Sequence, residues 1–235
     1  MRESSGRSGP RFEVIGVDAD DTLWHSEDSF DDVERNYVDL LTPYVAEGVD
    51  VRAALRATEQ RHLPISGYGV KAFTLSMVEC AVTVTEGHVP ADVIGDVLRL
   101  GMGMLIEPVR LLDGVAEVLA DLGRDHRLVL ITKGDLVHQS RKLESSGLAH
   151  HFSHIDIVME KDAATYRRIL HDLGVEPARF CMIGNSVRSD VLPVLAIGGA
   201  AVHVAYHVTW AHEVVDHDGS IVAAETLRDV PALLR

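Results

Sequence analysis

The chain has 235 residues, 46% of them hydrophobic and 25% charged, which is the composition of an ordinary soluble globular protein. With 22 Lys and Arg against 36 Asp and Glu, the formal net charge of −14 opposes extended contact with nucleic acid or with an anionic membrane. No stretch approaches ~18 consecutive apolar residues and the N-terminus has no apolar signal core, so neither a membrane span nor secretion is expected. Cys80 and Cys181 form no CxxC pair, which favours a reducing, cytoplasmic location.

The first structured stretch follows a predicted flexible tail, residues 1–11, which is rich in Ser and Gly. Residues 14–17 are an apolar run, as expected for a strand buried on both faces of a parallel sheet. Directly after it come three carboxylates and a hydroxyl, those of Asp18, Asp20, Asp21 and Thr22. Open α/β sheets bind their ligands beyond the carboxyl ends of such strands, so this cluster is the first candidate site.

The spacing of Asp18 and Asp20 carries chemical information. Side chains two apart in an extended segment point to the same side, so the two carboxylates repel unless a proton or a cation neutralises them. Hard oxygen ligands of this kind suit Mg²⁺. A turn or a helix N-cap is the alternative interpretation of an acidic cluster after a strand, and Asp21, which points the opposite way, is expected to have only a capping or solvent-facing role.

The next stretch, residues 26–105, has apolar residues at helical spacing and predicts an inserted all-α domain. Glycine and proline divide it into helical segments, among them residues 51–62, 71–84 and 91–104. Specificity tends to lie on loops near a cleft, so four residues of this insertion are candidates for contact with a substrate, although a core role is as plausible for the last of them: His62, Tyr68, Lys71 and Phe73.

From residue 108 onward helices and strands alternate, which predicts a doubly wound parallel sheet. Residues 12–25 and 106–235 are therefore expected to form one Rossmann-like α/β core. Asp162 is a plausible N-cap, and Gly147 and Gly174 are expected to end helices. The predicted elements are helices at 114–122, 136–146, 163–173 and up to 197, and strands at 127–131, 155–158, 180–183, 200–204 and, more weakly, 221–222.

Polar residues follow three later strands, as they follow the first. Thr132, Lys133 and Gly134 come after one strand, Lys161 after another, and the sequence GNSVRSD, residues 184–190, after a third. Because the carboxyl ends of parallel strands meet at one edge of the sheet, these residues are expected to lie near Asp18.

Together these stretches resemble the haloacid dehalogenase-like (HAD) superfamily. Its first motif, DxDxT, is matched by Asp18, Asp20 and Thr22; its second, a Ser or Thr at a strand end, by Thr132; and its third, a lysine before a helix, by Lys161. The fourth motif is an acidic loop, usually GDxxxxD, and residues 184–190 are similar to it. All four occur in the family's order over residues 12–205, and the helical insertion is similar to the family's C1-type cap.

The resemblance implies a Mg²⁺-dependent phosphomonoester hydrolase of the phosphatase branch, acting on a small phosphorylated metabolite. It implies that Asp18 is the nucleophile, that Asp20 is the general acid and base, and that Thr132 and Lys161 stabilise the phosphoryl oxygens. Substrate contacts are expected from Thr22, Lys133 and Gly134, and Lys133 competes with Lys161 for neutralising the phosphate. The implied metal ligands are Asp18, Asp20, Asn185 and Asp190.

One residue departs from the family pattern, because Asn185 stands where an aspartate is usual. Its carbonyl oxygen can still bind a metal but adds no charge, so a weaker site is expected, with Asp190 as the carboxylate of that loop. Phosphomutase, 2-haloacid dehalogenase and a catalytically idle binding protein remain alternatives. The dehalogenase is disfavoured because that branch typically lacks a carboxylate at the position of Asp20. The oligomeric state cannot be read from the sequence.

Overall fold

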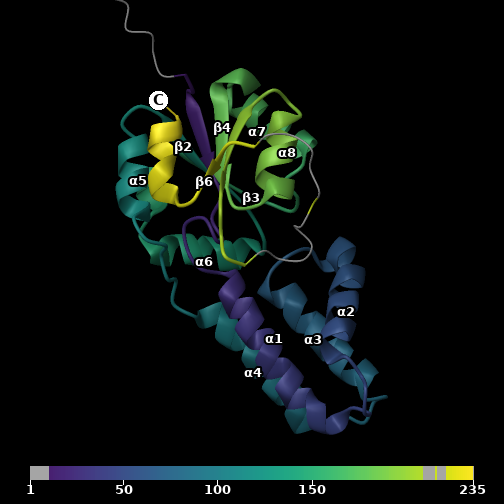
Figure 1. The fold of residues 1–235 in the computed structure, drawn as a ribbon. Helices are drawn as coiled ribbons and strands as arrows, with labels where there is room; N and C mark the ends of the chain where they lie inside the picture. The colour runs from purple at the N-terminus through teal and green to yellow at the C-terminus, as the bar shows by residue number, and fades with distance from the viewer. Residues whose placement is uncertain (1–10, 209–214, 216–220, 235) are drawn as a thin grey trace, which may run out of the picture.

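The computed structural model describes residues 11–208, 215 and 221–234, and the first ten residues of the predicted tail lie outside this range. The described chain forms a six-stranded sheet covered by helices, together with a separate group of four long helices (Figure 1). In the ribbon view the four helices lie beyond one end of the sheet. The predicted catalytic and metal-binding residues all belong to the sheet-containing part.

All five strand pairs of the sheet are parallel, and the strand order is β3-β2-β1-β4-β5-β6. The first strand is therefore central, and the order changes direction on its two sides, as in doubly wound α/β folds. This confirms the predicted fold class. The strands are β1 (Val14–Val17), β2 (Arg127–Lys133), β3 (His154–Val158), β4 (Phe180–Gly184), β5 (Ala200–Val204) and β6 (Ala223–Ala224).

Both faces of the sheet are buried, which explains why its strands are apolar without alternation. Ile15 and Val17 pack into one core with α5 (Val115–Leu122) and α6 (Leu136–Ser146). Val14, on the other face, packs with α7 (Ala163–Leu173) and α8 (Leu192–Leu195). Burying strands from both sides leaves their carboxyl ends as the place where polar groups can meet.

The four helices of the insertion have a hydrophobic core of their own, formed by buried residues such as Leu55 and Met77. Tyr37 is also fully buried there, and its hydroxyl donates a hydrogen bond to the backbone oxygen of Met77 at 2.7 Å. We call this group the cap; its helices are α1 (Glu27–Leu41), α2 (Val51–Ser66), α3 (Val70–Val84) and α4 (Ala91–Ile106).

The two chain crossings between the sheet and the cap lie side by side. The backbone N–H of His25 donates to the oxygen of Arg110 at 3.0 Å, and the N–H of Leu112 donates to the oxygen of Leu23 at 2.9 Å. Trp24 and Leu111 form an antiparallel bridge between these two bonds. The chain thus leaves the sheet domain and returns to it at one hydrogen-bonded place.

Several local expectations are confirmed. Asp162 caps α7 by accepting from the N–H of Thr165 at 2.7 Å, and Gly147 and Gly174 end α6 and α7 with left-handed backbone angles. The helix α2 runs four residues past the expected end, because Pro64 in its last turn removes only one helical hydrogen bond.

Two elements after β4 were predicted with the wrong bounds. The last strand is Ala223–Ala224 instead of residues 221–222, because these alanines are the residues that align with His203 and Val204 at the sheet edge. The segment after β4 begins with a π-helical turn, Val187–Val191, and its α-helix ends at Leu195, not at residue 197.

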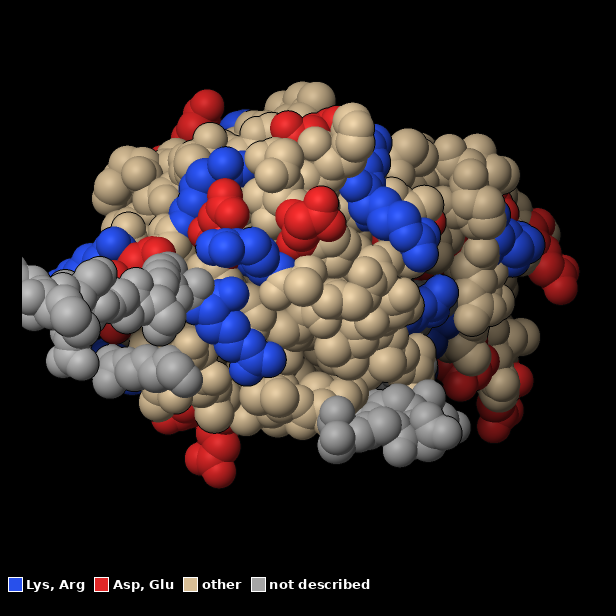
Figure 2. Space-filling model, turned by 90° about the horizontal axis from the view of Figure 1, so that it is seen from above, with Lys and Arg blue, Asp and Glu red and all other residues tan. Residues whose placement is uncertain are grey.

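The surface carries both signs of charge. On the face seen in Figure 2, Lys and Arg side chains are intermixed with Asp and Glu. In the described parts of the chain, no helix has both the length and the apolar character needed to cross a bilayer.

Candidate active site

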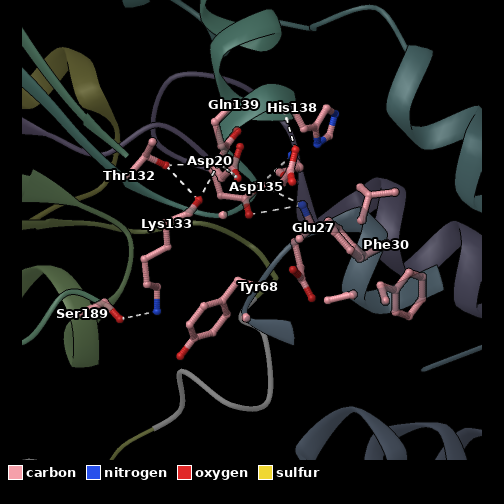
Figure 3. A pocket seen from close by; sticks show the side chains of 18 of the residues that line it. Asp20, Glu27, Phe30, Tyr68, Thr132, Lys133, Asp135, His138, Gln139 and Ser189 are labelled. Carbon is pink, nitrogen blue, oxygen red and sulfur yellow. Dashed lines mark hydrogen bonds between the residues drawn. The ribbon is translucent and has the colours of Figure 1, made fainter. Parts of the chain in front are cut away.

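One cavity lies where the carboxyl ends of four strands face the cap, and its volume is about 180 Å³. Residues after β1, β2, β3 and β4 line it together with cap residues. In Figure 3, Thr132, Lys133 and Ser189 lie on one side of this cavity, Glu27 and Phe30 on the other, and Tyr68 between them. From the strand ends the lining includes Asp18, Asp20, Thr132, Lys133, Gly134, Lys161, Asn185 and Asp190.

Asp18 is at the centre of the charged groups in this cavity. It follows β1, and its backbone N–H donates to the oxygen of Ile183 at 2.9 Å, which extends the strand pairing by one residue. Lys161 Nζ donates to Asp18 Oδ1 and also to Asp190 Oδ1, the latter at 2.7 Å. All three side chains are buried, so one ammonium is shared by two carboxylates away from bulk water.

Burial and the charge of Lys161 have opposite effects on the pKa of Asp18. Burial raises the pKa of Asp18 to about 7, and the Asp190 carboxylate adds to the rise, while Lys161 acts in the opposite direction. Burial would lower the pKa of Lys161, but Asp18 and Asp190 outweigh it and hold that pKa above its ordinary value. Lys161 therefore stays protonated, and any further positive charge at Asp18 would favour its ionised form.

Gly184 makes room for Asp190. A side-chain carbon at Gly184 would lie 2.2 Å from Asp190 Oδ2, which is closer than any non-bonded contact allows. Asp190 Oδ2 also accepts a hydrogen bond from the N–H of Ser186 at 3.0 Å. The glycine at the end of β4 is therefore what lets this carboxylate approach the strand and reach Lys161.

Three oxygens converge at a possible metal position. The side-chain oxygen of Asn185 faces Asp18 Oδ2 and the backbone oxygen of Asp20; with the amide turned by 180°, its nitrogen would donate to both at 3.2 Å. The first orientation needs a cation between the oxygens, and the second does not. The donor set of carboxylate, backbone carbonyl and amide oxygen suits Mg²⁺, although Asn185 brings no charge.

Asp20 is held at the cavity by three donors. Trp24 Nε1 donates to Oδ1 at 2.6 Å, Gln139 Nε2 donates to Oδ2 at 2.8 Å, and Lys142 Nζ also donates to Oδ1. Burial would raise the pKa of Asp20, but Lys142 first, and then Gln139 and Trp24, outweigh it and lower the pKa. The carboxylate is thus fixed in place and in its charged form.

The other expected substrate contacts divide into two groups. Thr132, Lys133 and Gly134 line the cavity; Lys133 Nζ donates to Ser189 Oγ at 2.8 Å and lies 4.3 Å from the centre of the Tyr68 ring. Thr22 does not line it: this residue is fully buried, and its hydroxyl lies 3.4 Å from Asp18 Oδ2. The expected substrate contact of Thr22 is therefore replaced by a contact that positions Asp18.

Comparison with known families agrees with this geometry. The sequence matches the haloacid dehalogenase-like hydrolases over residues 12–198, which is most of the chain. The chain belongs to this family. Residues from all four HAD motifs line the cavity. The comparison with curated proteins returned no match.

Solved structures of similar fold include HAD-like proteins of more than one activity. A haloacid dehalogenase-like family hydrolase from Xanthomonas campestris is 40% identical, with a TM-score of 0.87 over 97% of this chain and 93% of that one. A 2-haloacid dehalogenase from Pseudomonas syringae is 17% identical (TM-score 0.64, 95% and 98% covered). A predicted phosphoglycolate phosphatase from Haemophilus somnus is 19% identical (TM-score 0.63, 98% and 100% covered). At such low identity, the similarity to the last two proteins shows a shared fold and nothing about activity.

Two site residues of this HAD-like hydrolase were missed from sequence, and both lie on α6. Gln139 donates to Asp20 Oδ2, to Thr132 Oγ1 at 3.2 Å and to the backbone oxygen of Lys133 at 2.7 Å (Figure 3). Lys142 pairs with Asp20. Positions 135, 139 and 142 are four and three apart, so they share the face of α6 that begins at its N-cap, three residues after Thr132. That spacing is the signal that could have identified them.

Asp21 links the loop after β1 to the cap. Its carboxylate accepts hydrogen bonds from the backbone N–H groups of Ser26 at 2.8 Å and Glu27 at 3.1 Å, at the start of α1. Its φ is +60°, a left-handed conformation that Asp tolerates better than most residues. The expected capping role is therefore what the structure shows, but the side chain is buried and does not face solvent.

The cap closes the cavity of this hydrolase with residues from three helices and the α2–α3 loop. Of the four cap candidates, His62, Tyr68 and Phe73 line the cavity. Lys71 does not; its Nζ pairs with Asp135 at 3.0 Å, next to the hydrogen bond of 2.6 Å from the Tyr68 hydroxyl to Glu160 across the same boundary. Phe73 also belongs to the cap core, as expected.

Proposed function

We propose that this HAD-like hydrolase cleaves small phosphomonoesters with Mg²⁺ as cofactor. The observation that carries the proposal is the Asp20 carboxylate, held by three donors at the cavity two residues after Asp18. Phosphoryl transfer to a carboxylate needs an acid and base beside the nucleophile, and Asp20 stands where such a group is required. The cavity volume of about 180 Å³ fits a small metabolite and not a macromolecule.

Asp18 is the proposed nucleophile. In the first step one of its carboxylate oxygens forms a bond to phosphorus while the bond from phosphorus to the leaving oxygen breaks, giving an aspartyl phosphate. Lys161, already hydrogen-bonded to Asp18, offsets the charge of the phosphoryl oxygens, and Thr132 and Lys133 lie on the adjoining wall. The Thr22 hydroxyl donates to Asp18 Oδ2 at 3.4 Å and so helps to orient the nucleophile.

Asp20 is the proposed general acid and base. In the first step its proton goes to the leaving oxygen; in the second, its carboxylate accepts a proton from water as the water oxygen bonds to phosphorus and the bond to Asp18 breaks. The ion pair with Lys142 favours the charged form that the second step needs. A bound phosphate dianion acts in the opposite direction and favours the protonated form needed first.

The metal would be held by Asp18, the backbone oxygen of Asp20 and Asn185. Asp190, the remaining expected ligand, accepts from Lys161 with one carboxylate oxygen and from the N–H of Ser186 with the other. Mg²⁺ supplies positive charge to the phosphoryl oxygens when it is bound. Both cysteines are free and buried, which is compatible with the reducing cytoplasm that we propose as the location.

The alternative within the family is displacement of halide from a 2-haloacid. That reaction also begins with attack by a carboxylate, but a halide leaves without needing a proton. Its ester intermediate would still need a base to accept a proton from water, but no general acid is needed in the first step. Of the two roles proposed for Asp20, which Trp24, Gln139 and Lys142 hold at the cavity, it would use only one. The structure of the site therefore supports phosphate ester hydrolysis better.

The test is release of phosphate from p-nitrophenyl phosphate with and without Mg²⁺. We expect Mg²⁺-dependent turnover that Asp18→Asn abolishes, while Asp125→Asn, at an exposed position outside the cavity, leaves it unchanged. Turnover retained in Asp18→Asn would reject Asp18 as the nucleophile. Chloride release from 2-chloropropionate by the wild-type protein, with no phosphate release, would establish the dehalogenase instead.

A further inference from the structure

The cap half of the cavity contains two carboxylates that the proposed reaction does not use. Glu27 is the first residue of α1 and Glu59 lies in the middle of α2, so two different helices bring them to the cavity wall. Across the described residues, neither carboxylate has a hydrogen bond or an ion pair with a protein group. Figure 3 shows Glu27 beside Phe30 and across the cavity from Lys133.

The charged form of each of these carboxylates is unfavourable in its surroundings. Burial raises the pKa of Glu27 to about 8, and the nearby charges of Asp21, Glu59 and Asp20 add to the rise. Burial likewise raises the pKa of Glu59 to about 7, with Glu34 adding to it and Arg56 acting against it. Like charges in a partly desolvated place are stabilised most effectively by a cation between them.

A metal ion does not fit this pair. No group of three or more His, Cys, Asp or Glu side chains within the described ranges is arranged to hold a metal, so Glu27 and Glu59 lack the further ligands that such an ion requires. Aromatic rings lie in the same half of the cavity, where Phe30 and Phe73 pack edge to face at 5.3 Å. The polar lining residue His62 is already hydrogen-bonded to Ser76 and Glu79. Carboxylates beside aromatic rings are the surroundings that an organic cation prefers.

A second, independent feature of the cavity is a buried acceptor without a hydrogen-bond donor. Gln139 lines it and is only 4% exposed, and its side-chain oxygen Oε1 is buried without a hydrogen-bond partner among the described residues. A buried acceptor of this kind costs free energy until a ligand or water donates to it. The lining thus has unpaired acceptors, whereas its ammonium groups, those of Lys133, Lys142 and Lys161, are paired at the phosphate end.

We propose that the substrate is a phosphomonoester whose organic part carries an ammonium nitrogen, recognised by Glu27 and Glu59. The inference rests on the proposed phosphatase function. The cavity has opposite charges at its two ends: Lys161 and Lys133 meet the phosphate, and the two glutamates meet the cation. A zwitterionic ester can satisfy both ends at once, whereas a phosphate ester with an uncharged alkyl group leaves both carboxylates unpaired.

The test compares esters that differ only in that charge. Phosphocholine is matched by 3,3-dimethylbutyl phosphate, in which carbon replaces nitrogen, and phosphoethanolamine is matched by propyl phosphate. We expect kcat/KM with Mg²⁺ to be roughly tenfold or more higher for the ammonium member of at least one pair, as a charge-assisted contact predicts. Primary and quaternary ammonium are distinguished by which pair shows the larger ratio.

Variants assign the preference to the two residues. Glu27→Gln and Glu59→Gln should each lower the ratio, and the double variant should bring it close to one. Glu47→Gln, at an exposed cap carboxylate outside the cavity, should keep the wild-type ratio. Circular dichroism checks folding. Inhibition of p-nitrophenyl phosphate hydrolysis by choline, compared with 3,3-dimethylbutanol, tests the same preference in the wild-type protein without any variant.

The possible outcomes separate the two proposals. Equal kcat/KM within both pairs, with p-nitrophenyl phosphate hydrolysed and Asp18→Asn inactive, overturns the ammonium inference alone. A ratio that persists in the folded double variant overturns the roles of Glu27 and Glu59. Hydrolysis of no phosphate ester overturns the phosphatase function and this inference together.

Discussion

Lys142 on α6 forms an ion pair with Asp20, and both side chains line the cavity. The lysine comes from a helix outside the four family motifs, yet it contacts the proposed acid and base directly. Lys142 is a positioning residue, because it fixes the carboxylate without being required to touch the reacting atoms. Its removal should therefore affect turnover more than substrate binding.

For Lys142→Met we expect kcat for p-nitrophenyl phosphate to fall by about 10- to 100-fold, since a misplaced acid or base loses much of its effect. KM should change little. Steady-state kinetics measure both, and Arg141→Met, at the exposed neighbouring position, is the matched control. An unchanged kcat in a folded Lys142→Met protein would show that Gln139 and Trp24 suffice to hold Asp20.

Asn185→Asp should strengthen Mg²⁺ binding. Ligand charge governs the affinity of oxygen sites for divalent ions, so we expect the Mg²⁺ dissociation constant to fall by about tenfold. Isothermal titration calorimetry without substrate measures this directly. Asn36→Asp adds the same charge at an exposed position and should have no effect. If calorimetry shows the same affinity for wild type and Asn185→Asp, Asn185 does not bind the metal.

Gly184→Ala should damage both the fold and the site. The added methyl group would meet Asp190 Oδ2 at 2.2 Å and push this carboxylate away from Lys161, with a loss of about 1–3 kcal/mol in the free energy of unfolding. Urea denaturation measures the loss. In α4, Gly103 has open space around it, so Gly103→Ala should be neutral or stabilise the protein by up to about 1 kcal/mol. Equal stability of the two variants would contradict the contact.

The raised pKa of Glu59 predicts that the free energy of unfolding decreases as the pH rises. Its pKa is about 7 in the folded protein against 4.5 ordinarily, so the folded state holds the proton more tightly and stability falls as pH rises from 4.5 to 7. Glu59→Gln removes this penalty. We expect the variant to gain about 1–2 kcal/mol over wild type at pH 8 relative to pH 5, measured by urea denaturation. Glu47→Gln should show no such difference; equal behaviour of both variants would contradict burial of Glu59.

Much of the α/β part could be predicted because its signals are local. An apolar run such as residues 14–17, followed at once by Asp18, identifies a strand and its carboxyl end without knowledge of distant contacts. The parallel order then brings Thr132 and Lys161 to the same edge. The roles assigned to these residues remain predictions until the variants are measured.

The residues of the site that could not be predicted are those whose positions depend on how the helices pack against the sheet and against each other. Gln139 and Lys142 read from sequence as polar positions of an amphipathic helix, and only the packing of α6 directs them at Asp20. Glu27 and Glu59 are 32 positions apart in sequence and meet through the packing of α1 and α2. Thr22 was placed wrongly for a similar reason, because the loop after β1 turns its hydroxyl inward.

The adjacent chain crossings at His25–Arg110 and Leu23–Leu112 have a consequence for protein engineering. The two ends of the cap segment meet at one hydrogen-bonded place. A longer or shorter segment between them would therefore leave the geometry of the sheet domain unchanged. A helical cap from another protein could be joined at these two positions without stretching β1 or displacing Asp18. Substrate preference could then be exchanged as a module while the chemistry stays with the sheet.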